Sequence, residues 1–315
     1  MRDPFVFVVG KGRSGTTLVR AMLTAHPDMA IPPETHFIVP LSMDESVVPD
    51  QQQVDVDAFV DRLERHHGFP GMGLEATELR RELAQRAPLG YADAVRGLFE
   101  SYAHKQGKSR YGDKTPGHVL HIPVLASLFE EARFVHVIRD GRNVMLSNFD
   151  TAFGPAGIAE GALVWRRLVT EGRRTGRALG PERYCEVRYE DLLEDPEAVI
   201  RSVSAFCSLD YHEDMLRYFE RGSTIVGSAD HHRNLDLPPT KGLRDWSSEM
   251  PAHQLAVFER LAGDQLEAFG YEKSTARLGP RARAELGISW MAFQARRVKS
   301  RLTRTQPLKK SVSAR

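Results

Sequence analysis

The sequence predicts an α/β fold in which a parallel sheet lies between two layers of helices. Short runs rich in β-branched and aromatic residues have the length and composition of strands. Such runs occur at Phe5–Val9, Met29–Ile31, Phe134–Ile138 and Tyr184–Arg188. Long helical patterns separate them, so successive strands need crossover connections and run parallel. Ligands of such sheets bind beyond the carboxyl ends of the strands, where we expect the four following loops to converge.

Helices are predicted where apolar residues recur three and four positions apart. They are expected at Thr16–Ala25, Val56–His67, Ala76–Gln85, Tyr91–Lys105, Val119–Phe129, Asn143–Phe149, Ile158–Leu179, Pro196–Cys207 and Pro251–Phe269. Residues 40–112 show this periodicity without a strand pattern and are interpreted as a helical insertion. We expect residues 1–272 to form the main domain and residues 273–315 to form a basic, partly helical tail.

The composition is typical of a soluble globular protein, with 41% hydrophobic and 27% charged residues among 315. Two cysteines, Cys185 and Cys207, provide no disulfide scaffold and have no metal-ligand spacing around them. The first strand begins at the fifth residue, which leaves no room for a signal peptide, and no apolar run has membrane-spanning length. The sequence therefore predicts a cytoplasmic protein.

The charge is unevenly distributed along the chain. Residues 276–315 hold eleven Lys or Arg against one acidic residue, although the whole chain has a net charge of only +1. Leu286, Trp290 and Phe293 have helical spacing in this tail, which suits either a docked helix with a solvated basic end or peripheral contact with an anionic membrane. No base-stacking module is visible, so nucleic acid is not an expected partner.

A glycine-rich loop, Gly10–Thr17, follows the first strand and opens the first helix. Its glycines let successive backbone N–H groups face one anion, and the helix dipole adds to that field. Thr16 stands where a nucleoside-triphosphatase loop carries its lysine, so the contact with β- and γ-phosphates is missing. Arg13 and the hydroxyls of Ser14, Thr16 and Thr17 instead suit a 5′-phosphate that bears one further group of low charge.

Residues 10–18 resemble the 5′-phosphosulfate loop of sulfotransferases that use 3′-phosphoadenosine 5′-phosphosulfate (PAPS), and residues 13–28 are especially similar to tyrosylprotein sulfotransferases and bacterial relatives. The resemblance extends in order over residues 5–272. It implies a P-loop-like sulfotransferase fold and PAPS as the co-substrate. The implied donor-binding residues of this loop are Lys11, Gly12, Arg13, Ser14, Gly15, Thr16 and Thr17.

Residues 134–147 resemble the 3′-phosphate site of the same family, in which an arginine at the strand end and a serine eight residues later hold the phosphate. These two positions correspond to Arg139 and Ser147. A guanidinium offers planar bidentate donation to phosphate oxygens, which agrees with this role. The alternative is a structural ion pair between Arg139 and Asp140 or Asp113.

Two further segments are similar to the family. Residues 184–192 look like its late strand and the "Y-E-D-L" ending, where Tyr189 would touch the nucleotide. Lys241 and Gly242 resemble the lysine-glycine segment that closes over the 3′-phosphate, with Arg244 as the competing candidate.

Glu34 is the expected general base, since it follows the second strand and therefore lies at the carboxyl edge of the sheet. It matches the glutamate assigned as base in tyrosylprotein and some bacterial sulfotransferases. A helix-cap or surface carboxylate is the structural alternative, and His36 and His118 are rival bases. His118 follows Lys114 by four residues, whereas the catalytic histidine of cytosolic small-molecule sulfotransferases follows the lysine by two.

Lys114 lies in Gly112–Pro116, which resembles the family segment whose lysine stabilises the transition state. With Arg13 and Thr16 it would reach the bridging oxygen of the leaving phosphate. An exposed salt-bridge lysine is the alternative. The moving sulfuryl group carries less charge than a phosphoryl group, so no metal is demanded.

The sequence thus predicts in-line sulfuryl transfer from PAPS to a hydroxyl or amine. Residues 40–112 and 222–245 are expected to wall the site of a small-molecule, carbohydrate, lipid or peptide acceptor. A nucleotide kinase-like phosphotransferase is the second hypothesis, but it predicts a lysine at Thr16. A nucleotide-binding protein without catalysis is the third, but it predicts the loss of Glu34 or Lys114, and the chain has both.

Overall fold

The computed structural model describes residues 2–49, 53–149, 155, 157–221, 236–238 and 244–288. The chain divides into two compact units. The first comprises residues 1–139 and 167–243, and the second comprises residues 140–166 and 244–315.

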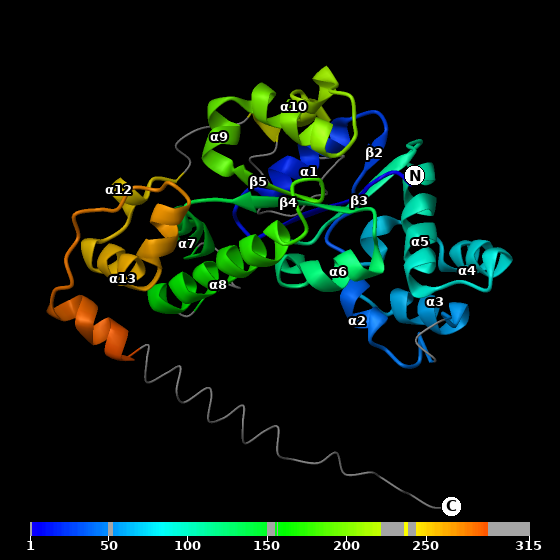
Figure 1. Ribbon diagram of the computed structural model, residues 1–315, viewed down its shortest axis with the longest axis horizontal. Coiled ribbons are helices and arrows are strands. Elements are labelled where there is room, and N and C mark those ends of the chain that lie inside the picture. Colours follow the sequence, from blue (N-terminus) through cyan, green and yellow to red (C-terminus); the bar gives the residue numbers. More distant parts are fainter. Residues whose placement is uncertain are drawn as a thin grey trace, which may run out of the picture. The chain divides into compact units, whose positions relative to one another are not determined.

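The first unit is built on a five-stranded parallel sheet, as the alternation of strands and helices predicts (Figure 1). Its strands, in sheet order, are β2 (Met29–Ala30), β3 (Arg110–Lys114), β1 (Phe5–Gly10), β4 (Ala132–Ile138) and β5 (Tyr184–Arg188). The sequence pattern predicts four of these strands and misses β3, whose first residues fall in the range assigned to the helical insertion. β3 pairs with β1 through Val8 and Lys114, so Lys114 stands beside the end of β1, just before the glycine-rich loop.

The helical periodicity predicted most helices of the first unit but missed two short ones, Ile38–Ser42 and Tyr189–Glu194. The helices of this unit are α1 (Thr16–Ala25), α2 (Ile38–Ser42), α3 (Val56–Glu64), α4 (Ala76–Arg86), α5 (Tyr91–Lys105), α6 (Ile122–Leu128), α9 (Tyr189–Glu194) and α10 (Pro196–Phe206), with short 3₁₀ turns η1 (Pro70–Met72), η2 (Pro116–Leu120), η3 (Glu213–Met215) and η4 (Tyr218–Arg221). α8 (Ile158–Arg177) gives its first nine residues to the second unit and the remainder to the first.

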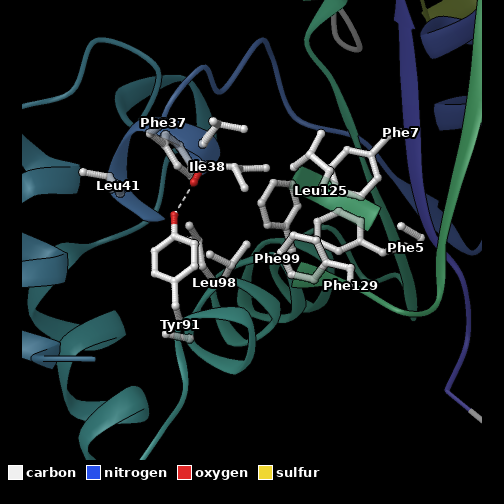
Figure 2. Packing of buried hydrophobic residues seen from close by; sticks show 14 of the residues in the cluster. Phe5, Phe7, Phe37, Ile38, Leu41, Tyr91, Leu98, Phe99, Leu125 and Phe129 are labelled. Atoms are coloured by element: carbon white, nitrogen blue, oxygen red, sulfur yellow. Dashed lines mark hydrogen bonds between the residues drawn. The ribbon is translucent and has the colours of Figure 1, made fainter. Parts of the chain in front are cut away.

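Strand β1 divides the first unit into two cores because successive side chains leave a strand on opposite faces. Phe5 and Phe7 join the core under α5 and α6, whereas Val6 and Val8 join the core under α1 and α10. Figure 2 shows the first core, in which the Phe5 ring lies 4.9 Å, centroid to centroid, from each of two phenylalanine rings of the α5 and α6 region. The sheet therefore has a helical layer on each face (Figure 1).

The residues between α2 and α5 pack into the same core as β1, so the helical insertion is continuous with the sheet domain. The hydroxyl of Tyr91, the first residue of α5, donates to the carbonyl of Ile38 at 2.5 Å (Figure 2). Tyr91 thereby ties the insertion to the segment that follows Glu34.

The second unit contains α7 (Gly141–Phe149), α12 (Trp246–Glu249) and α13 (Ala252–Ala268), and a further helical segment begins at residue 280. Arg142 is its fully buried centre. The guanidinium lies 2.7 Å from a carboxylate oxygen of Asp140 and of Glu259 and 3.5 Å from the ring centroid of Trp246. Among the described residues, no helix has both the length and the apolar character needed to cross a bilayer.

A buried histidine in β4 predicts acid sensitivity of the fold. His136 is fully buried, its Nδ1 lies 2.7 Å from the Tyr184 hydroxyl, and burial lowers its pKa to about 4. Folding thus favours the neutral imidazole, and this stabilisation is complete above about pH 6.5 and is lost as the pH falls towards 4. We expect the free energy of unfolding, measured with urea, to fall by about 2 kcal/mol between pH 7.5 and pH 5 on account of this group. His136→Gln should remove that part of the pH dependence, and an unchanged slope in the variant would contradict the assignment.

Candidate active site

The glycine-rich loop between β1 and α1 has the backbone geometry of an anion cradle. Arg13 and Gly15 have positive φ angles of 74° and 95°, and α1 begins immediately afterwards at Thr16. Ser14 is 1% exposed, and its Oγ has no hydrogen-bond partner among the described residues. A buried hydroxyl without a partner is costly, so this loop suits a ligand that brings an oxygen to Ser14.

Three loops meet at this cradle, as expected for the carboxyl edge of the sheet. The ring of Tyr189, the first residue of α9, lies against Gly15, where a Cβ would come within 2.2 Å of a ring carbon. The guanidinium of Arg139, which follows β4, stacks on the same ring at 4.5 Å, and its Nη1 donates to the carbonyl of Arg13 at 3.2 Å. Burial raises the pKa of Tyr189, so its phenol stays protonated at neutral pH.

Gly15 provides a direct test of this loop geometry. We expect Gly15→Ala to reduce the free energy of unfolding by about 2 kcal/mol or more, because a side chain is strained at this φ and also collides with Tyr189. Gly12→Ala is the matched control in the same loop, since a Cβ at Gly12 meets nothing within 4 Å. Its cost should stay below about 0.5 kcal/mol. Equal costs in urea denaturation would show that the Tyr189 contact does not constrain the loop.

Glu34 and Lys114 form an ion pair at the fourth loop. Lys114 Nζ lies 2.6 Å from Glu34 Oε1 and 3.4 Å from the Thr17 hydroxyl, which belongs to the first turn of α1. His36 Nε2 lies 3.0 Å from the other oxygen, Glu34 Oε2. The lysine is therefore located between the carboxylate and the glycine-rich loop, and the alternative of an exposed salt-bridge lysine is wrong because Lys114 is only 2% exposed.

The ionisation of this pair follows from its surroundings. Burial alone would raise the pKa of Glu34, but the hydrogen bond from His36 and the charge and hydrogen bond of Lys114 outweigh it and bring the pKa down to about 2. Glu34 is therefore a carboxylate at neutral pH. Burial lowers the pKa of the Lys114 ammonium even though Glu34 opposes this effect.

His118 lies apart from this pair. Lys114 and its predecessor Asp113 are consecutive in β3, so their side chains leave the sheet on opposite faces. His118 Nδ1 lies 3.0 Å from Asp113 Oδ2, and the imidazole is almost fully buried. This position disfavours His118 as a base that would act beside Lys114, whereas His36 contacts Glu34 directly.

The remaining predicted site residues are divided between the second unit and the part of the chain outside the described residues. Ser147 lies in α7 of the second unit, and its role in holding the 3′-phosphate together with Arg139 stays a prediction. Lys241 and Gly242 lie outside the described residues. Arg244, the competing candidate, lies 3.2 Å from the Glu249 carboxylate in the second unit. No group of three or more His, Cys, Asp or Glu within the described ranges is arranged to hold a metal ion.

Three residues next to the ion pair were not among the predicted site residues, namely Thr35, Asp113 and Thr115. Asp113, which was considered only as an ion-pair partner of Arg139, is fully buried and accepts hydrogen bonds from Thr35, Thr115 and His118. Only their positions in the sequence could have pointed to these residues, since Thr35 follows Glu34 and Asp113 precedes Lys114.

Comparison with known proteins identifies the relatives of this chain. The profile of the family described as "Sulfotransferase family" matches residues 4–213. A putative protein-tyrosine sulfotransferase of Caenorhabditis briggsae is 24% identical over 290 residues, which cover 87% of this chain and 91% of that protein. The omega-hydroxy-beta-dihydromenaquinone-9 sulfotransferase Stf3 of Mycobacterium bovis is 25% identical over 330 aligned residues, with coverages of 88% and 79%.

Two solved structures share the fold. The sulfotransferase domain of the Synechococcus PCC 7002 olefin synthase has a TM-score of 0.57 and 24% identity, and the match covers 86% of this chain and 97% of that domain. The sulfotransferase domain of the curacin biosynthetic pathway has a TM-score of 0.51 and 18% identity, with coverages of 91% and 98%.

Proposed function

Because the chain belongs to the sulfotransferase family, we propose that it transfers a sulfuryl group from PAPS to an acceptor hydroxyl, with Glu34 as general base. The observation that carries this proposal is the position of Lys114, between Glu34 and the glycine-rich loop. A base and a cation for the leaving group thus lie side by side at the cradle where the donor would bind. Sulfuryl transfer needs both groups, together with alignment of donor and acceptor.

The residues present fit PAPS. The backbone N–H groups of residues 15–17 and the Ser14 hydroxyl would hold the 5′-phosphosulfate, since a phosphate oxygen would supply the partner that Ser14 Oγ requires. Arg139 would hold the 3′-phosphate, and the Tyr189 ring orients its guanidinium.

The proposed chemistry assigns one task to each group of the ion pair. Glu34 takes the proton of the acceptor hydroxyl while the acceptor oxygen forms a bond to sulfur. The bond between sulfur and the 5′-phosphate oxygen breaks in line, and Lys114 stabilises the electron pair that this bridging oxygen receives. As Lys114 turns towards the bridging oxygen, Glu34 loses one of the interactions that depress its pKa, and it becomes a stronger base when the donor is in place.

The names of the relatives support a hydroxyl acceptor. Those relatives are named for protein tyrosine and for an omega-hydroxy menaquinone, two acceptors that share only the hydroxyl group. We therefore propose that the acceptor of the present chain also reacts through a hydroxyl group. The acceptor class, whether small molecule, carbohydrate, lipid or peptide, is best identified by incubating the enzyme with ³⁵S-labelled PAPS and a metabolite extract.

Thermal denaturation with nucleotides tests the donor site. We expect 3′-phosphoadenosine 5′-phosphate (PAP), the product nucleotide, to stabilise the protein by about 2.7 kcal/mol at a hundred times its Kd. ADP with magnesium at the same concentration should stabilise it far less. Stabilisation by ADP and magnesium alone would overturn the proposal in favour of a kinase-like phosphotransferase.

Arg139→Ala tests the 3′-phosphate contact. We expect PAP to bind about 10–150-fold more weakly, the equivalent of a charged hydrogen bond of roughly 1.5–3 kcal/mol. Adenosine 5′-phosphosulfate, which has no 3′-phosphate, should lose much less affinity. Arg201→Ala is the matched control, since this arginine of α10 stacks on the Tyr211 ring and is remote in sequence from the loop. Equal losses for both nucleotides in calorimetric titration would contradict the assignment.

A further inference from the structure

A buried carboxylate lies behind the ion pair and is not used by the proposed mechanism. Asp113 is 0% exposed and accepts three hydrogen bonds. Its Oδ1 receives the Thr35 hydroxyl at 2.7 Å and the Thr115 hydroxyl at 3.3 Å, and its Oδ2 lies 3.0 Å from His118 Nδ1. Burying a carboxylate is expensive unless its oxygens are satisfied in this way. The hydrogen bonds that satisfy the buried Asp113 carboxylate also fix the positions of the groups that donate them.

The position of this group follows from strand geometry. Asp113 and Lys114 are consecutive in β3, where successive side chains leave the sheet on opposite faces. Glu34 and Thr35 are consecutive in the loop after β2, and each meets one of these two side chains. The two segments are therefore joined twice. Glu34 meets Lys114 at 2.6 Å on one side, and Thr35 meets Asp113 at 2.7 Å on the other.

Beyond the end of β2, side-chain hydrogen bonds replace the backbone hydrogen bonds that join β2 to β3. β2 pairs with β3 only at Met29 and Ala30, so the sheet hydrogen bonds between these strands end before Glu34. Beyond that point the Thr35 N–H donates to the Thr115 hydroxyl at 3.2 Å. The loop that carries the base is thus fastened to the end of β3 by a network centred on a single carboxylate.

The opposite side of the same loop is also confined. A Cβ at Gly68 would come within 2.2 Å of the Thr35 carbonyl oxygen, so the segment after α3 lies directly against this peptide. Thr35 is consequently held between the insertion and β3. Little freedom remains for the backbone at Glu34 to shift relative to the end of β3 without breaking these contacts.

We propose that Thr35, Thr115 and Asp113 are positioning residues that set the spacing between Glu34 and Lys114 for sulfuryl transfer. This inference rests on the proposed function. The three side chains act through the ion pair and not on the substrate. Since a displacement of about 1 Å at a reacting group can cost about 10²-fold in rate, their loss should lower turnover more than nucleotide affinity.

The test removes one hydroxyl and then restores it. Thr35→Val keeps the shape of the side chain but cannot donate to Asp113. We expect kcat to fall about 10–100-fold while the Kd for PAP changes less than about threefold, and Thr35→Ser should recover most of the rate. The assay follows PAP release from PAPS with 4-nitrophenol as acceptor or, where this phenol is not accepted, with a metabolite extract.

Thr175→Val is the matched control. Thr175 is a buried threonine of α8 whose hydroxyl donates to the Glu171 carbonyl at 2.7 Å. This variant should lose a comparable amount of thermal stability but retain the wild-type kcat. Thr115→Val provides a second variant of the network, with the same expected pattern as Thr35→Val.

The outcomes separate this inference from the proposed function. A wild-type protein that releases no PAP from PAPS with any acceptor would refute the function itself. Active wild type with unchanged kcat in Thr35→Val and Thr115→Val would overturn the positioning role alone. Failure of both variants to fold, with Thr175→Val intact, would also overturn it, because the network would then serve stability.

Discussion

Glu34→Gln is expected to reduce turnover by about 10²–10⁴-fold while leaving the affinity for PAP nearly unchanged. The amide has almost the same shape and can still accept a hydrogen bond from Lys114, which lies 2.6 Å from the native carboxylate. It cannot take the acceptor proton. Steady-state rates of PAP release, together with calorimetric titration of PAP, measure the two quantities separately.

Glu267→Gln is the matched control for this substitution. Glu267 pairs with Lys273 at 2.7 Å in the second unit, so the change removes a carboxylate from an ion pair of similar length that is exposed to solvent. Turnover should remain within about twofold of wild type, because exposed pairs contribute little. Unchanged turnover in Glu34→Gln would transfer the base assignment to His36, whose Nε2 lies 3.0 Å from Glu34.

Lys114→Met should lower kcat by about 10²–10³-fold, the usual effect of removing one transition-state donor. Methionine resembles the lysine stem in volume and suits a site that is only 2% exposed, so the fold should persist. The loss should fall on kcat, because the proposed role of Lys114 is to stabilise the leaving oxygen as charge develops there. Single-turnover rates, with the enzyme in excess over PAPS and the acceptor saturating, provide the measurement.

Lys108→Met separates a catalytic lysine from a structural one. The Lys108 ammonium donates to the carbonyls of Thr24, His26 and Met29, at and just after the carboxyl end of α1. Its loss should lower thermal stability and leave kcat near the wild-type value. If Lys114→Met behaves in the same way, Lys114 is a structural cation and the leaving-group role is wrong.

The sequence was most informative where one residue pattern had one structural meaning. The run Phe5–Val9 predicted β1 because it is apolar throughout and a glycine-rich loop follows it. β3 could not be predicted in this way. Arg110–Lys114 contains no apolar run, and it is a strand because β1 and β2 offer it backbone partners on both edges.

Helix ends show the same dependence on local contacts. α3 ends at Glu64, whereas periodicity predicted helix as far as His67. The imidazole of His66 accepts a hydrogen bond from the Gly68 N–H at 3.1 Å, which favours a turn at this point over another helical turn. Hydrophobic spacing does not encode such a contact.

The candidate site was predictable in part. Strand-edge reasoning and the family resemblance both located Glu34, Arg139 and Tyr189 near the glycine-rich loop, whereas Lys114 was located by the resemblance alone. The Asp113 network was not predictable, because its hydrogen bond to Thr35 joins residues 78 positions apart and threonines of this kind occur throughout any sequence. Only the folded chain reveals which threonines meet a buried carboxylate.

The close approach of Gly68 to the Thr35 peptide has a consequence for how this enzyme can diversify. The region expected to select acceptors contacts the peptide next to Glu34, the proposed base, whereas the proposed donor site is assembled from the loops after β1, β4 and β5. Remodelling the insertion to admit a new acceptor would therefore disturb catalytic rate before it disturbed donor affinity. Engineered variants with altered selectivity should need compensating changes around Thr35, while the donor loops can be left as they are.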